Sequence, residues 1–104
     1  VTSAQIADAA LVEMVAIATE AKTAVLHALG ITSPVSGRLA TGTGTDAIAV
    51  FSGHGVGRAR FAGKHTLLGE RLAVLVMQAL HSSVNYDSLN SNSVVDAQVP
   101  SPCA

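Results

Sequence analysis

Threonines and glycines alternate in the least ordinary passage of the chain, Thr41-Gly42-Thr43-Gly44-Thr45-Asp46. In an extended backbone, side chains two positions apart share one face at a spacing of about 6.5–7 Å. The hydroxyls would then form a row, and the glycines would open the opposite face to close approach. A hydroxyl row beside a carboxylate suits the binding of a polar amide or the activation of water. A glycine-softened edge strand with locally bonded hydroxyls is an equally good interpretation.

Two other pairs of charged side chains are candidates for the same chemistry. Lys64 and His65 precede an expected helix, whose first N–H groups attract anions, so they could hold a carboxylate or stabilise an oxyanion. Glu20 and Lys22 lie in an otherwise apolar segment, where a charge costs free energy unless it is paired. Lys64 and His65 could instead belong to a solvated basic turn, and Glu20 could belong to the solvent-exposed polar stripe of a helix.

Four elements must position these residues. Apolar residues at helical spacing predict one helix over Ser3–Leu29 and another from Thr66 to about His81. Between them, the apolar run Ala47–Phe51 predicts a buried strand, and Arg58–Ala62 predicts a second strand after a glycine-rich turn. The sequence therefore predicts a single small α/β (α+β) domain in the order helix–strand–strand–helix. In it, an antiparallel strand pair packs on two helices.

The ends of these elements follow from capping residues. Ser3 and Thr66 are candidate N-caps, and Gly30 is placed to end the first helix. Two apolar stripes leave that helix little polar surface, so we expect it to be covered on most sides. Asn, Ser and Asp predominate after Ser82, so we expect a folded unit over residues 1–82 and a mobile polar tail over 83–104.

The expected hairpin makes a prediction about the site. Asp46 stands at the beginning of the first strand, and Lys64 follows the end of the second. Antiparallel strands joined by a short turn bring these two points to the same edge of the sheet. We therefore expect Asp46 and Lys64 to line one pocket, together with Thr43, Thr45 and His65.

Composition limits the classes of function and partner. A net charge of −1 provides no basic face for nucleic acid, and charged residues interrupt every apolar stretch before the roughly 18 residues of a membrane span. Cys103 is the single cysteine and the histidines show no ligand spacing, so we expect no metal, no cofactor and a cytoplasmic location. A hydrophobic content of 49% in 104 residues predicts a homo-oligomer, or a partner that covers apolar surface.

Four passages carry a resemblance to a known family: Ala10–Glu13, Thr19–Lys22, Ala40–Ala47 and Ala62–Glu70. In order and spacing they resemble the adenosylcobinamide amidohydrolase family of corrinoid salvage. The resemblance implies hydrolysis of the amide that joins the aminopropanol arm of adenosylcobinamide to a side chain of the corrin ring, giving adenosylcobyric acid for cobalamin synthesis. The family's chains carry a further half before the matching region. This chain is therefore expected to be the C-terminal half, and to be active only with the missing N-terminal half.

Amide hydrolysis needs an activated nucleophile, a stabilised oxyanion and a proton for the departing amine. On this chain, Asp46 or Glu20 could act as the base on water or on a threonine hydroxyl. Lys64 and the backbone at the start of the second helix could stabilise the oxyanion, and His65 could donate the proton. The expected substrate-binding positions within the motifs of the resemblance are Thr41, Thr43, Thr45, Lys22, Gly42 and Gly44. The corrinoid would be the substrate and not a cofactor.

A non-catalytic binding or structural oligomer, a remnant of that family, is the alternative function. The two can be distinguished by the gene upstream of Val1. A long in-frame extension favours the enzyme, and a stop codon favours the remnant.

Overall fold

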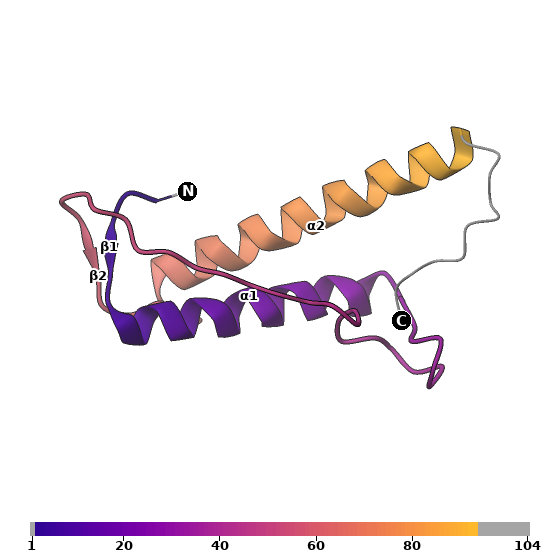
Figure 1. Cartoon of the computed structure of the whole chain (residues 1–104), viewed down its shortest axis with the longest axis horizontal. Coiled ribbons are helices and arrows are strands. Elements are labelled where there is room, and N and C mark those ends of the chain that lie inside the picture. Colours follow the sequence, from indigo (N-terminus) through magenta and orange to yellow (C-terminus); the bar gives the residue numbers. More distant parts are fainter. Residues whose placement is uncertain (1, 94–104) are drawn as a thin grey trace.

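The computed structural model of the chain describes residues 2–93, and the side chains of residues 2–85. Its elements are β1 (Gln5–Ile6), α1 (Asp8–Ala28), β2 (Arg58–Ala59) and α2 (Leu67–Ser93). The order is therefore strand–helix–strand–helix, and the expected helix–strand–strand–helix order is wrong. Figure 1 shows α1 and α2 side by side and running in the same direction, with β1 and β2 together at one end of the molecule.

The two short strands are parallel, and the antiparallel pair expected from the sequence is wrong. Gln5 lies opposite Arg58, and Ile6 lies opposite Ala59. Parallel strands need a long crossover between them, and α1 with the loop after it provides that crossover. The hairpin prediction failed because the partner of β2 is a segment near the N-terminus and not the preceding apolar run.

The start of the chain is extended because it is bonded to the segment that precedes β2. The Gly55 N–H donates to the Ser3 carbonyl at 2.6 Å, and the Gly53 N–H donates to the Ala4 carbonyl at 2.9 Å. On the strand itself, the Ile6 N–H donates to the Ser52 hydroxyl at 2.8 Å. These long-range bonds hold the first residues out of the helix, so Ser3 is not its N-cap. Helix α1 begins at Asp8 without a side-chain cap.

The far end of α1 follows the prediction. Gly30 has a φ of +67°, in the left-handed region that glycine adopts freely. Its N–H donates to the His27 carbonyl at 3.1 Å, and the Ile31 N–H donates to the Leu26 carbonyl at 3.0 Å. This pair of bonds is the Schellman ending of a helix, in which a glycine stops the last turn.

One stripe of α1 forms the centre of the core. The helical residues buried along it are Ala10, Met14, Ile17, Ala21 and Val25. At the strand end of the molecule, Ala10 and Met14 cluster with Ile6 and Ala62, and Val50 and Leu68 pack against the cluster. The helix is not covered on most sides within the described structure, because Val12 on another face is 72% exposed.

The apolar run Ala47–Phe51 is extended but belongs to no strand within the described residues. In Figure 1 the chain that contains it runs back alongside both helices, from the far end of α1 toward the strands. Val50 packs against the core cluster, which fixes this run beside the helices by side-chain contact. The predicted buried strand is therefore wrong, because this run pairs with no strand in the described structure and only Val50 of its five residues is half-buried.

Helix α2 starts as predicted. The Thr66 hydroxyl accepts the Gly69 N–H at 3.1 Å, which is the N-cap bond, and donates to the Gly63 carbonyl at 2.7 Å. The helix continues past His81 to Ser93. The rest of the predicted mobile tail, residues 94–104, lies outside the described residues. Neither helix, over the residues described, is long and apolar enough to cross a membrane.

Candidate functional site

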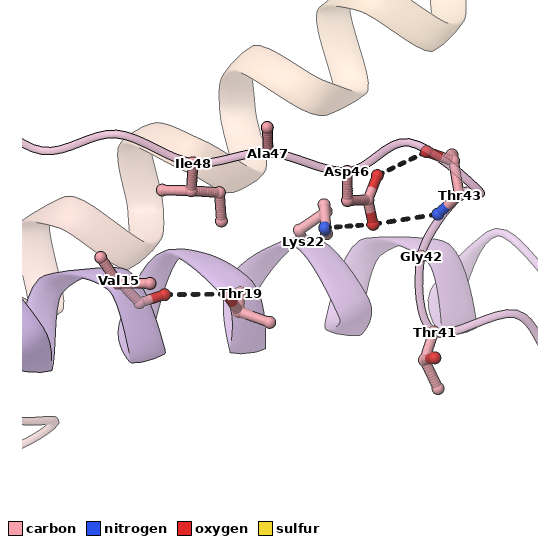
Figure 2. A pocket seen from close by; sticks show the side chains of 9 residues that line it. All are labelled: Val15, Thr19, Lys22, Thr41, Gly42, Thr43, Asp46, Ala47 and Ile48. Carbon is pink, nitrogen blue, oxygen red and sulfur yellow. Dashed lines mark hydrogen bonds and ion pairs between the residues drawn. The ribbon is translucent and has the colours of Figure 1, made fainter.

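A pocket of about 410 Å³ lies between α1 and the loop that follows it. Figure 2 shows its lining, which combines polar residues of the loop and the helix with an apolar wall. The lining residues are Val15, Thr19, Lys22, Thr41, Gly42, Thr43, Asp46, Ala47 and Ile48. The helical members Val15, Thr19 and Lys22 recur every three or four positions, so they share one face of α1.

Lys22 and Asp46 form the charged centre of this pocket. The Lys22 Nζ lies 2.5 Å from the Asp46 Oδ2, and the two side chains are 19% and 30% exposed. A charge on a mostly apolar helix is expected to find a partner, and Asp46 is that partner. Lys22 is the more shielded of the two partners, and Asp46 lies on the exposed loop.

Thr43 completes the bonding of the Asp46 carboxylate. The Thr43 N–H donates to Oδ2 at 2.9 Å, and the Thr43 hydroxyl donates to Oδ1 at 2.5 Å. The Lys22 ammonium first, and then the Thr43 hydroxyl and N–H, lower the pKa of Asp46 from 3.8 to about 2. Hydrogen bonds to the charged form stabilise it, so Asp46 is a carboxylate over the whole range in which proteins work.

This bonding decides which roles Asp46 suits. A general base is most effective when its pKa lies near the working pH, and a carboxylate with a pKa of about 2 is a weak proton acceptor. Asp46 is instead well suited to hold other groups in place. The Lys22 ammonium carries three N–H donors, so one bond to Asp46 leaves donors for a ligand oxygen in the pocket. The Thr43 hydroxyl donates to Asp46 and retains its acceptor lone pairs.

Gly42 is the position that gives the carboxylate its space. A Cβ at this residue would overlap the Asp46 Oδ2 and would lie 3.7 Å from the Lys22 Nζ. Any larger residue would therefore displace the carboxylate from its place beside the ammonium. The close approach expected of the glycines is seen at Gly42, whereas a Cβ at Gly44 would meet nothing within 4 Å.

The second pair of predicted charges lies elsewhere. The Lys64 Nζ is 3.1 Å from the Glu20 Oε2, with side chains 63% and 54% exposed. Both residues line a pocket of about 300 Å³ between α1 and α2. Glu20 and Lys22 are two positions apart on the helix, so they project about 200° apart, at roughly 100° per residue. The two ion pairs therefore lie on different sides of α1.

The prediction that Asp46 and Lys64 line one pocket is consequently wrong. It rested on an antiparallel hairpin, and each residue is instead paired with a different side of α1. Thr45 and His65, expected in the same place, are exposed and do not line the Lys22–Asp46 pocket. The expected row of hydroxyls is absent because residues 41–46 form bends and a turn. In Figure 2 the Thr41 side chain points away from the Asp46 carboxylate.

Sequence reasoning missed four residues that line the pocket: Val15, Thr19, Ala47 and Ile48. Thr19 stands one helical turn before Lys22 and within the same motif, so helical spacing from Lys22 is a signal that could have found it. Ala47 and Ile48 directly follow Asp46 but were assigned to a buried strand. In the part of the chain that the structure describes, no three His, Cys, Asp or Glu residues are grouped as metal ligands.

Comparisons with known proteins place these residues in a family context. The family model described as adenosylcobinamide amidohydrolase (CbiZ) matches residues 1–91. An uncharacterized protein of Methanocaldococcus jannaschii is 40% identical over 81 residues, which are 77% of this chain and 31% of that protein. The chain thus spans less than a third of the length of this relative. No solved structure matches the chain significantly.

Proposed function

Since the chain belongs to the adenosylcobinamide amidohydrolase family, we propose that it contributes the Lys22–Asp46 pocket to the hydrolysis of the adenosylcobinamide amide. The observation that carries this proposal is the ammonium of Lys22, held by Asp46 in a pocket lined by residues of the family-matched segment. The corrinoid enters as the substrate. The match covers 31% of the relative, so the hydrolytic activity of the whole protein is itself part of this proposal.

The reaction adds water across the carbon–nitrogen bond of the amide. The water oxygen bonds to the carbonyl carbon. The carbon–nitrogen bond breaks, its electron pair stays on the nitrogen, and that nitrogen takes a proton from the water. The products are the carboxylic acid, adenosylcobyric acid, and free aminopropanol. Negative charge develops on the carbonyl oxygen on the way, and a fixed donor aimed at that oxygen lowers the barrier.

Lys22 is the residue we assign to this oxygen. Its ammonium is already held in place by Asp46, so little reorganisation is needed when the substrate arrives. Asp46 acts as a positioning residue for Lys22 and Thr43, in keeping with its low pKa. The free lone pairs of the Thr43 hydroxyl can accept a hydrogen bond from the attacking water or from the amide N–H.

Glu20 and Lys64 remain the second candidate pair, with His65 beside them in sequence. Their ion pair also stands at a pocket and also joins α1 to a motif of the resemblance. Its exposure of more than half on both side chains is the property that ranks it below the first pair, because water screens exposed charges.

The test is a matched set of variants in the protein expressed from its complete reading frame. Lys22→Met and Asp46→Asn neutralise the first pair, and Lys64→Met and Glu20→Gln neutralise the second. Release of aminopropanol and formation of adenosylcobyric acid are followed by mass spectrometry. Asp8→Asn is the control for loss of an exposed carboxylate on α1.

We expect Lys22→Met to lower kcat by about 10²–10³, the usual cost of losing one oxyanion donor. If only the Lys64 and Glu20 variants lose turnover, the chemistry belongs to the pocket between the helices. A wild-type protein that binds corrinoid and releases no aminopropanol would favour the alternative function, a non-catalytic corrinoid-binding remnant.

A further inference from the structure

Thr23 directly follows Lys22 on α1 and forms a bond that the proposed chemistry does not use. Its hydroxyl donates to the backbone carbonyl of Thr41 at 2.8 Å. Thr41 begins the loop that carries Thr43 and Asp46. We propose that Thr23 is a positioning residue that holds this loop against α1, so that Asp46 meets Lys22. The inference rests on the proposed function of the pocket.

The loop over residues 41–46 is held to α1 at both of its ends. Within the described residues, two hydrogen bonds join it to the helix: Lys22 to Asp46 at one end, and Thr23 to Thr41 at the other. The donors are neighbours on the helix, and their acceptors are the last and first residues of the loop. The loop contains bends and a turn but no helix or strand, so these two bonds, with the buried Ala40 that precedes it, set its position.

The direction of the Thr23 hydroxyl distinguishes it from an ordinary helical threonine. Such a side chain commonly bonds the carbonyl four residues earlier in its own helix. Thr19 does so, donating to the Val15 carbonyl at 2.8 Å. The Thr23 hydroxyl donates to the Thr41 carbonyl of the loop instead of to the Thr19 carbonyl of its own helix. Thr23 is half-buried, whereas Thr41 stands on the exposed loop, so the bond ties an exposed segment to the helix.

The consequence for the site follows from the length of the loop. Ala40, directly before the loop, stays buried and bonded to the Ile31 carbonyl, so the chain remains anchored there. Without the bond at Thr41, the residues between Ala40 and Thr43 lose their hydrogen bond to α1, and Thr43 gains freedom to move. The two bonds from Thr43 to Asp46 then loosen, although neither of their partners has been changed. Thr23 thus acts on the pocket through Thr41 and touches no reacting atom.

The test compares Thr23→Val, which keeps the shape and removes the hydroxyl, with Thr23→Ser, which keeps the hydroxyl. Ser83→Ala is the matched control, since the Ser83 hydroxyl bonds the Ala79 carbonyl of its own helix. Thr23→Ala is a second deletion should the valine variant not fold. Two quantities are measured in the complete protein: hydrogen exchange of the Thr43 amide, and kcat and KM for adenosylcobinamide.

We expect Thr23→Val to speed Thr43 exchange roughly three- to tenfold, the range for one net hydrogen bond, and to lower kcat more than it raises KM. Thr23→Ser and Ser83→Ala should exchange like the wild type. Unchanged exchange in the valine and alanine variants, or equal acceleration in the serine variant, would overturn the inference. A wild type without hydrolysis overturns the proposed function alone, because the exchange comparison still decides the role of Thr23.

Discussion

The Lys22 ammonium and the Asp46 carboxylate meet at 2.5 Å although 24 positions separate them in the chain. Lys22 comes from the middle of α1, and Asp46 comes from the loop that returns along it. Thr43 reinforces the contact with a hydroxyl and an N–H on the same carboxylate. The first two predictions below depend on this small network.

Gly42→Ala should disrupt the network without unfolding the protein. The new Cβ would occupy the place of the Asp46 Oδ2, and a flexible carboxylate can move away at low cost to the fold. We expect the Asp46 pKa to rise from about 2 toward 3.8, and hydrolysis to fall about tenfold or more. Carbon-detected NMR titration of the carboxyl measures the first quantity. Gly44→Ala is the control for that titration, because its Cβ would meet nothing, and an equal rise there would contradict this account.

Acid should weaken the folded state through Asp46. Its pKa is about 2 when folded against 3.8 ordinarily, so between these values the unfolded chain binds more protons. The stabilisation from this group is complete above about pH 3.8 and is lost as the pH falls toward 2. Urea midpoints measured across this window should fall with pH in the wild type, and the fall should be smaller in Asp46→Asn. Thr43→Val should lie between the two, and identical pH slopes in all three proteins would be evidence against the Asp46 network.

Gly69→Ala should destabilise the protein although alanine is the better helix former. A Cβ at this position would overlap the backbone carbonyl oxygens of Ala62 and Gly63, which cannot move as a side chain does. Forcing extra volume into such a contact costs about 1–3 kcal/mol of the free energy of unfolding. Chemical denaturation measures it. Gly57→Ala serves as the control, since its Cβ would make only an ordinary 3.8 Å contact with Ala4, and a neutral Gly69→Ala would mean that α2 shifts without cost.

Exposed apolar side chains predict that the chain associates. Phe51 is 82% exposed and Val56 is fully exposed, and Phe61 is exposed after β2. Scattered apolar residues are normal on a surface, but large ones on nearby segments favour an interface. Light scattering at micromolar concentration should report a mass above that of a monomer, and Phe51→Ser with Phe61→Ser should lower it. A soluble wild-type monomer would count against a homo-oligomer.

Local signals predicted the helices well where the controlling contacts are local. Gly30 ends α1, and Thr66 caps α2, because both act within one turn of the helix they bound. The buried stripe of α1 follows equally from helical spacing. The start of α1 was placed too early because Ser3 and Ala4 are bonded to glycines about fifty positions later, which no local pattern reveals.

The sequence predicted several residues of the site correctly but not which of them lie together. Thr43, Asp46 and Lys22 were candidates from residue type and resemblance, and the structure brings them together. The expected hairpin placed Lys64 beside Asp46, because consecutive strands often pair. In the structure β2 pairs instead with β1, which precedes α1 in the chain. Glu20 and Lys22 are two positions apart on α1, so they lie on different sides of the helix. Which charged residue pairs with Glu20 and which with Lys22 depends on the path of the chain in three dimensions.

Because α1 holds Asp46 on one side and Lys64 on the other, both loops depend on the same helix for their position. Neither can keep its place once the middle turns of α1 open. The two candidate pockets should therefore melt together as one cooperative unit, with amide exchange in both governed by the opening free energy of that helix. A substitution that frays α1 from within, far from either ion pair, would disable both pockets at the same denaturant concentration.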